Sequence, residues 1–299
     1  MTQKCLPNLR TFVKLSKKYS VIPVSMKVEI KNDPIYSLSA MRDPSFAFER
    51  GGISIFGQAD EVAAFERNRE QSPFDTISGL LAGESAPLSQ LSFSGGVVGY
   101  IGYDSARPMF DMDWKEPDLV SLPHSMLLKV SRFYEAREGA LKAVYCAEVN
   151  DEPERVYRRA AEEAELMLKL PRPRSLKGPR LSEASANVKK AEYIKMVDEV
   201  KGRISRGEIG QAITSRRISC RAVDPLAAYF RLRKINPCPY IFYLRAGDRA
   251  VLGSSPENFL TLRGDFAESR PVASTRRRGV NPAEDRRLEL ELRQSPKER

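Results

Sequence analysis

Acidic, hydroxyl and basic side chains that could do chemistry are concentrated in one stretch of this sequence, residues 253–279. Glu257 follows three small residues and a proline, so we expect its carboxylate at the end of a strand, facing a pocket from a fixed backbone. Thr275 precedes a run of three arginines, residues 276–278, which suits an anionic ligand. Because exposed glutamates and arginine runs are usually solvated faces, neither feature identifies a site by itself.

A second candidate is Gln211, at the start of a predicted strand over residues 211–218. Alternation along a strand would place Gln211, Ile213 and Ser215 on one face. An inward glutamine needs hydrogen-bond partners, because a buried amide without them costs about 1–3 kcal/mol. A bound ligand or an ordered water could supply these partners.

The sequence argues against several kinds of catalytic centre. Its one histidine, His124, has no evident base or orienting acid around it, which disfavours a Ser-His-Asp or Cys-His mechanism. The four cysteines lie far apart without a C-x-x-C pair, so a zinc site is not expected and the thiols are predicted to be buried and reduced. The glycines of residues 95–102 lack the lysine of a phosphate loop and fit a strand that a neighbouring backbone approaches closely.

The composition is typical of a globular protein. The chain has 299 residues, 41% hydrophobic side chains and a net charge of +10. Acidic residues are interspersed among the basic ones, so the charge requires no nucleic acid partner and we expect none. No apolar run of about 18 residues and no signal-peptide pattern occurs, which predicts a cytoplasmic protein without membrane insertion.

Helical and strand patterns alternate irregularly, with antiparallel hairpins instead of repeated βαβ units. We therefore predict an α+β fold with large antiparallel sheets and surrounding helices. The clearest hairpin joins residues 45–50 to residues 53–57 through paired glycines, and further strands are predicted at residues 127–135 and 140–149.

A segment rich in proline and arginine interrupts these patterns, since it can sustain neither a helix nor a sheet ladder. It predicts a linker over residues 171–187. The chain is thereby divided into an N-terminal region, residues 1–170, and a second region, residues 188–299, which opens with a helix over about residues 189–206.

Several motifs, taken together and in this order, resemble the large, chorismate-using component of anthranilate synthase (component I). The resemblance covers nearly the whole chain, is looser in the N-terminal half and implies the anthranilate/aminodeoxychorismate synthase-like fold. Five ordered matches are much more specific than any one of them. The strongest are Gln211 with Ser215-Arg216-Arg217, Asn236-Pro237-Cys238-Pro239-Tyr240, Gly253-Ser254-Ser255-Pro256-Glu257 and residues 270–279. In the N-terminal half, Gly95-Gly96-Val97-Val98-Gly99-Tyr100 and Phe46-Ala47-Phe48-Glu49 match more loosely.

The resemblance implies the synthesis of anthranilate and pyruvate from chorismate and ammonia, in tryptophan biosynthesis. Mg²⁺ would bind the substrate carboxylate, and a glutamine amidotransferase subunit (component II) would supply the ammonia. Glu257 would then be the general acid for the departing ring hydroxyl, a role that suits a carboxyl held near neutral pKa in a closed pocket. Thr275, Ser274 and Ala273 would contact the substrate.

Two positions separate this chain from relatives of the same superfamily. Isochorismate and salicylate synthases carry a water-activating lysine where this chain has Gln211, which indicates use of ammonia and a catalytic position for this glutamine. Many aminodeoxychorismate synthases carry a nucleophilic lysine where this chain has Ala273, which favours the ortho product. Aminodeoxychorismate synthase component I, of the para-aminobenzoate and folate branch, remains the alternative enzyme.

Three departures from the family pattern affect these expectations. Ser274 replaces the usual glycine and would narrow the pocket. Tryptophan, the feedback inhibitor of the family, would bind through Glu49, Pro239, Tyr240 and Ile241, but the motifs around them are altered. Residues 297–298 enter a Lys-Glu motif that the chain does not continue, leaving Glu298 as one candidate ligand of Mg²⁺.

The interrupted Lys-Glu motif predicts that the chain is truncated at its C-terminus and is an inactive fragment of the enzyme. Missing strands would leave apolar faces uncovered, which predicts low stability or aggregation. A different class of protein stays open as well: a paralogue that binds an amino acid without catalysis.

Overall fold

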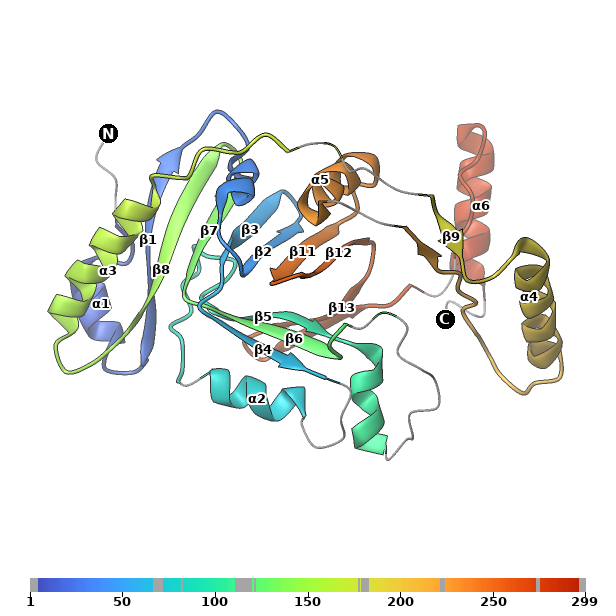
Figure 1. Ribbon diagram of the computed structural model, residues 1–299, viewed down its shortest axis with the longest axis horizontal. Helices are drawn as coiled ribbons and strands as arrows, with labels where there is room; N and C mark the ends of the chain where they lie inside the picture. Colours follow the sequence, from blue (N-terminus) through green and yellow to red (C-terminus); the bar gives the residue numbers. More distant parts are fainter. Residues whose placement is uncertain are drawn as a thin grey trace.

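The structure, a computed structural model, describes residues 5–66, 72–81, 83–110, 120, 122–176, 178, 183–220, 224–272 and 275–295 (Figure 1). At its centre is a seven-stranded antiparallel sheet with the strand order β1-β8-β7-β3-β2-β11-β12. This sheet and the helices around it confirm the predicted α+β fold. Its strands are β1 (Val21–Glu29), β2 (Ser45–Arg50), β3 (Ile53–Gln58), β7 (Arg132–Arg137), β8 (Ala140–Glu148), β11 (Tyr240–Ala246) and β12 (Arg249–Ser255).

A second sheet of three antiparallel strands, β4-β6-β5, packs against one face of the large sheet. The chain passes between the sheets at Ser131, whose N–H donates to Asp60 Oδ2 (2.7 Å) and whose carbonyl accepts from the Cys146 N–H (2.7 Å). The single strand predicted over residues 127–135 is therefore wrong, because Ser131 ends one strand and the next belongs to the other sheet. The three strands are β4 (Glu61–Phe65), β5 (Gly96–Ile101) and β6 (Ser125–Val130).

Gly99 in β5 and Gly102 just after it allow the close backbone approach that the sequence indicated. A Cβ added at Gly99 would lie 2.0 Å from the Met126 carbonyl oxygen, and one at Gly102 would lie 2.4 Å from the His124 carbonyl oxygen. Side chains at these two positions would therefore push β5 away from β6.

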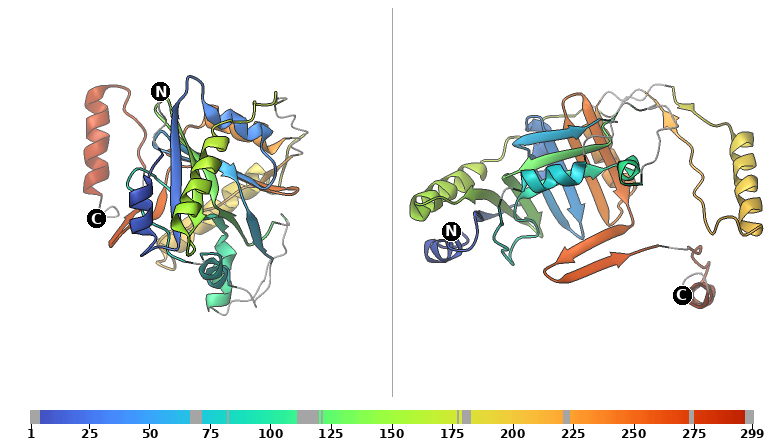
Figure 2. Two further views of the ribbon diagram at one scale, coloured as in Figure 1. Left: turned by 90° about the vertical axis from the view of Figure 1, so that its left-hand side faces the viewer. Right: turned by 90° about the horizontal axis from the view of Figure 1, so that it is seen from below.

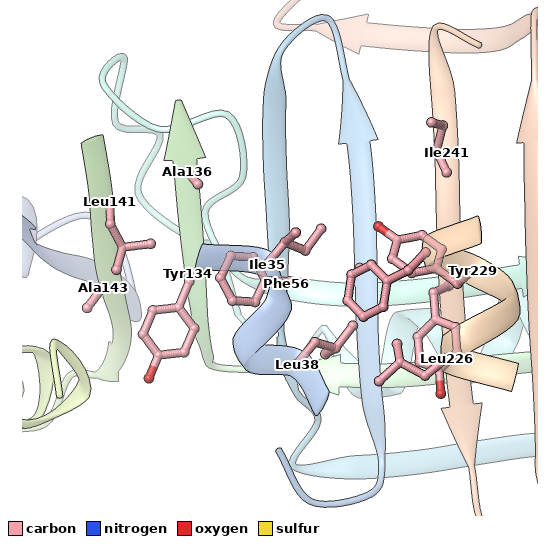
Figure 3. Close-up of a cluster of buried hydrophobic side chains, with 13 residues drawn as sticks. Ile35, Leu38, Phe56, Tyr134, Ala136, Leu141, Ala143, Leu226, Tyr229 and Ile241 are labelled. Carbon is pink, nitrogen blue, oxygen red and sulfur yellow. The ribbon is translucent and has the colours of Figure 1, made fainter. Parts of the chain in front are cut away.

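Helices cover the face of the large sheet that lies opposite the three-stranded sheet. The 3-10 helix η1 (Pro34–Ala40) and α5 (Pro225–Ile235) enclose one core with the sheet, and Figure 3 shows ten labelled side chains of it. Another core lies beneath α1 and α3 at the end formed by β1 and β8, where Phe12 packs edge-on against Tyr157 with ring centroids 5.4 Å apart. The other helices of this part of the chain are α1 (Leu9–Leu15), α2 (Pro73–Leu80), the 3-10 helix η2 (Tyr103–Phe110) and α3 (Pro153–Met167).

The cap residues explain where the two C-terminal helices begin. Asp224 Oδ1 accepts hydrogen bonds from the N–H groups of Leu226 and Ala227 at the start of α5. Asn281 Oδ1 accepts from the Glu284 N–H at the start of α6 (Pro282–Gln294). Each helix has a proline in its first turn, where a missing N–H is not costly.

The elements after residue 183, other than α5, β11 and β12, are more exposed. Figure 2 shows α4 and α6 at the end of the large sheet opposite α1 and α3. No residue of α4 is buried, although its predicted helix is confirmed. These elements are β9 (Ser185–Ala186), α4 (Lys190–Ser205), β10 (Ile218–Ser219), β13 (Asn258–Arg263), β14 (Phe266–Arg270) and α6.

One sheet contains strands from both predicted regions of the chain. Six residues of β11 pair with β2, which joins residues 240–245 to residues 45–50. The division at residues 171–187 stays a prediction about organisation, and the large sheet extends across it. Among the described residues, no helix combines the length and the apolar character needed to cross a lipid bilayer.

The close approach of the β6 backbone to Gly99 leads to a prediction about the free energy of unfolding. Gly99→Ala is expected to lower the free energy of unfolding by about 1–3 kcal/mol, because the new Cβ meets backbone and not a movable side chain. The matched control is Gly79→Ala in α2, where an added Cβ meets nothing within 4 Å. Urea denaturation of both variants would measure the difference, and equal midpoints would contradict this account of β5.

Candidate functional site

A cleft of about 1030 Å³ lies beside the paired strands β2 and β11, and we call it the β2–β11 cleft. It brings together segments that are far apart in the sequence. They are the turn after β2, the loop at residues 89–92, the end of β12, and β13. The cleft is lined by Phe48, Glu49, Arg50, Gly51, Ile53, Ile55, Ser89, Leu91, Ser92, Arg137, Tyr240, Ile241, Phe242, Ser255, Glu257, Asn258, Phe259, Leu260, Thr261, Leu262 and Arg263.

Glu257 lies on this cleft, two residues after the end of β12, as its sequence context predicted. Its N–H donates to Ser255 Oγ (3.2 Å), and its own Oε1 accepts from the Val272 N–H (3.2 Å). The carboxylate is thereby tied to the segment that leads to residues 273–275. Its side chain is exposed on the open cleft, which differs from the closed pocket expected for it.

Two of the three arginines that follow Thr275 bind acids of this same chain. Arg277 pairs with Glu284, and Arg278 Nη2 lies 2.6 Å from Asp285 Oδ2, both acids being in the first turn of α6. The hydrogen bond from the Val280 N–H, and then the one from Arg277, lower the pKa of Glu284. Arg277 and Arg278 therefore hold the turn at the start of α6.

The other predicted substrate residues are only partly described. Thr275 is exposed, and its carbonyl accepts a hydrogen bond from Arg276 Nη1 (3.1 Å). Ala273, Ser274 and Glu298 lie outside the described residues. Their roles stay predictions.

Gln211 does not occupy the inward strand position predicted for it. It is exposed, and of residues 211–218 only Ile218 is in a strand, β10, which pairs with β9. The predicted strand is wrong because a strand needs a neighbour for its N–H and C=O groups, and no described strand pairs with residues 211–217. Among the described residues, no hydrogen bond joins Gln211 to Glu257.

The residues predicted to bind an inhibitor divide between two faces of the large sheet. Tyr240 pairs with Arg50, and Ile241 pairs with Glu49. Because side chains alternate along a strand, Tyr240 and Arg50 face one way while Ile241 and Glu49 face α5. Ile241 is buried in the core beneath η1 and α5, and Pro239 is exposed just before β11. Only the backbone of Glu49 is free to line the cleft.

The Glu49 carboxylate is held by side chains of α5 and β3. Its Oε1 accepts from Tyr229 Oη (2.6 Å), and its Oε2 accepts from Ser54 Oγ (3.2 Å). Arg233 Nε lies 2.8 Å from both oxygens, while Arg233 Nη1 reaches Asp33 Oδ2 at 2.6 Å. Burial opposes the charge on Arg233, but its bonds to Glu49 and Asp33 outweigh that effect and raise its pKa.

This hydrogen-bond network around Glu49 was not predicted from the sequence. Burial, and then the Glu49 charge, raise the pKa of Tyr229, so its hydroxyl stays protonated and keeps donating. The available sequence signal was the i,i+4 spacing of Tyr229 and Arg233, which places both side chains on one face of α5. Their partner, 184 residues earlier than Arg233, could not be deduced from that spacing.

A buried ion pair fixes one wall of the β2–β11 cleft. Glu135 is 3% exposed, and its Oε1 lies 2.7 Å from Lys142 Nζ. Its Oε2 accepts from the Ser92 N–H (2.6 Å), and Lys142 also donates to the Gln90 carbonyl. The loop at residues 89–92 is thus held by side chains, although it belongs to no strand.

The described residues do not form a metal site. They include no group of three or more His, Cys, Asp or Glu side chains placed to hold a metal ion. Of the four cysteines, Cys146 is buried and burial raises its pKa to about 12, whereas Cys220 is exposed. The expectation of buried thiols is therefore correct for Cys146 and wrong for Cys220.

Comparison with known proteins gives the family. Residues 38–299 match the chorismate binding enzyme family. The chain belongs to that family. Among curated proteins it is 36% identical to anthranilate synthase component 1 of Geobacillus stearothermophilus, over 71% of this chain and 46% of that protein. It is 34% identical to anthranilate synthase component 1 of Haloferax volcanii, over 83% of this chain and 50% of that protein.

Solved structures of an anthranilate synthase component and of an isochorismate synthase share the fold. Anthranilate synthase component I from Streptococcus pneumoniae superposes with a TM-score of 0.65 at 19% identity, covering 86% of this chain and 58% of that one. The menaquinone-specific isochorismate synthase from Escherichia coli superposes with a TM-score of 0.51 at 14% identity. This superposition covers 97% of this chain and 64% of that one. This member of the chorismate binding enzyme family thus spans about half the length of the first curated relatives it matches.

The Glu49–Arg233 ion pair leads to a second prediction about the free energy of unfolding. Arg233→Met is expected to lower the free energy of unfolding by about 3 kcal/mol, since it leaves a largely buried carboxylate without its cation. The control is Arg287→Met in α6, where an exposed pair with Glu291 should contribute under about 0.5 kcal/mol. Urea denaturation would compare them, and an Arg233→Met variant as stable as the control would contradict the role given to Glu49.

Proposed function

We propose that this chain is an anthranilate synthase large component, which makes anthranilate and pyruvate from chorismate and ammonia. The observation that carries the proposal is the position of Glu257, on the β2–β11 cleft with its carboxylate bonded to the Val272 N–H. The family match and the names of the curated relatives support the same reaction. We further propose that a glutamine amidotransferase subunit supplies the ammonia, as the family resemblance implies.

In the proposed reaction Glu257 acts as a general acid. It donates a proton to the ring hydroxyl of chorismate, which leaves as water, while ammonia forms the new C–N bond. Loss of the enolpyruvyl group as pyruvate then makes the ring aromatic. A general acid placed for such a transfer contributes about 10²–10⁴-fold to the rate. Thr275, Ala273 and Ser274 are proposed to contact the substrate.

Mg²⁺ remains a proposal from the family, with Glu298 as one candidate ligand. The described residues do not supply the several carboxylates that Mg²⁺ would need, and no step above depends on it. When bound, the ion would offset the charge of the substrate carboxylates.

Regulation by tryptophan is a separate proposal, and the structure limits which residues could serve it. Tyr240 lines the β2–β11 cleft and Pro239 is exposed beside it. The Ile241 side chain and the Glu49 carboxylate face α5, so they could take part only through their backbone or after rearrangement.

The test is an assay of the purified chain with chorismate, ammonium and Mg²⁺. The proposed reaction would give anthranilate, detected by fluorescence and identified by chromatography, and Glu257→Gln would lower its rate at least about 100-fold with chorismate binding retained. Glu289→Gln is the control, because Glu289 forms an exposed pair with Arg293 on α6.

The results of this assay distinguish the alternative functions that the sequence left open. Para-aminobenzoate chemistry in place of anthranilate would favour the aminodeoxychorismate branch. Saturable chorismate binding without product would favour the predicted inactive fragment. Absence of both product and chorismate binding would contradict the proposed function.

A further inference from the structure

A cavity of about 330 Å³ lies where α5, the 3-10 helix η1 and residues 174–176 meet, and we call it the α5 pocket. It is on the face of the large sheet opposite the three-stranded sheet, and it shares no lining residue with the β2–β11 cleft. Three of its lining side chains are cations, Arg174, Arg231 and Lys234, and none of the described residues that line it is an acid. The pocket is therefore positively charged.

Two of these cations are carried by one face of α5. The i, i+3, i+4 and i+7 positions of this face are Ala227, Phe230, Arg231 and Lys234. Ala227 and Phe230 are buried, whereas Arg231 and Lys234 are exposed. Phe230 stacks on Tyr36 of η1, with ring centroids 4.7 Å apart and planes 26° from parallel. The helix backbone behind both cations is thus fixed by packing.

The third cation comes from a segment that is anchored to η1. The Arg174 N–H donates to Ser39 Oγ (2.8 Å), and the Arg174 carbonyl accepts from the same hydroxyl (3.3 Å). Two residues later, Leu176 packs against the core beneath η1 and α5. The backbone at residues 174–176 is therefore held beside the pocket.

Within the described chain, no carboxylate forms an ion pair with Arg174, Arg231 or Lys234. Arg233 differs from them, because it lies on another face of α5 and pairs with Glu49 on β2. Three like charges around one cavity repel one another, and an anion bound among them would replace this repulsion by attraction. The charges of the α5 pocket thus favour an anionic ligand.

We propose that the α5 pocket binds a small phosphate-bearing anion through Arg174, Arg231 and Lys234. A phosphate group carries about −1.5 to −2 charges at pH 7 and three strong acceptor oxygens, so it can pair with several cations at once. Guanidinium groups donate two parallel hydrogen bonds to such oxygens, and a lysine adds a compact charge. The volume limits the ligand to a small one, since ligand pockets span about 300–1,000 Å³. The inference goes beyond the proposed reaction and does not depend on it.

The experiment measures pyrophosphate binding to the whole purified chain by calorimetry or ³¹P NMR, in a buffer without phosphate, Mg²⁺ or chorismate. We expect saturable binding of pyrophosphate and none of acetate, whose single charge cannot engage three cations. Arg231→Gln combined with Lys234→Gln should weaken pyrophosphate binding at least about tenfold, because a hydrogen bond to a charged group contributes about that factor. Glutamine preserves the helix propensity of α5.

The matched control is Arg158→Gln combined with Arg159→Gln, which removes two positive charges from exposed positions of α3 and should leave pyrophosphate affinity unchanged. Arg174→Gln is an independent test from the other side of the pocket. It leaves α5 intact and should also weaken binding about tenfold. Urea denaturation of each variant separates lost affinity from lost folding, and Arg174→Gln decides the question if the α5 variant does not fold.

Two results would overturn the proposal. One is the absence of saturable pyrophosphate binding to the unmodified chain. The other is an equal loss of affinity in the α3 control, since attraction would then follow net charge and not the α5 pocket. Because the assay contains no chorismate, neither result bears on whether the chain makes anthranilate.

Discussion

The pairing of β2 with β11 is the contact on which the site depends. Six backbone pairs join residues about two hundred positions apart, and they add β11 and β12 to a sheet built otherwise from the first half of the chain. Without this ladder, Glu257 at the end of β12 would have no fixed position relative to Arg50 or Phe48. The pairing also decides, for each residue of both strands, which face of the sheet its side chain occupies.

The face that meets α5 is stabilised by charge as well as by packing. Glu49 is bound by Tyr229 and Arg233, so the helix is attached to β2 by hydrogen bonds in addition to its apolar contacts. Removing Arg233 would leave the carboxylate uncompensated, because the low-dielectric interior makes an unpaired charge costly. The same contact keeps Glu49 from serving as a ligand group of the cleft. One ion pair therefore fixes a helix and shapes the chemistry on the opposite face.

Local sequence patterns account well for some elements. The hairpin of β2 and β3 follows from paired glycines between alternating residues, and α5 and α6 follow from Asp224 and Asn281 as caps before a proline. Elements that depend on distant partners were predicted poorly. Ser131 splits a continuous apolar run because Asp60 and Cys146 take its backbone groups. Residues 211–217 have strand-like alternation but no described neighbour, while Phe259 and Phe266 of the β13–β14 hairpin remain 90% and 82% exposed.

By itself, the sequence determined the α+β class, the ends of the capped helices, the family resemblance and the position of Glu257 after a strand. These follow from propensity, alternation and motif order, all of which are encoded locally. Only the tertiary structure decided that Arg50 shares the cleft with Glu257, that Glu49 faces α5, and that Arg277 and Arg278 are bound by α6. The physical reason is that strand register and ion pairing between distant residues are settled when the whole sheet forms, and no local pattern specifies them.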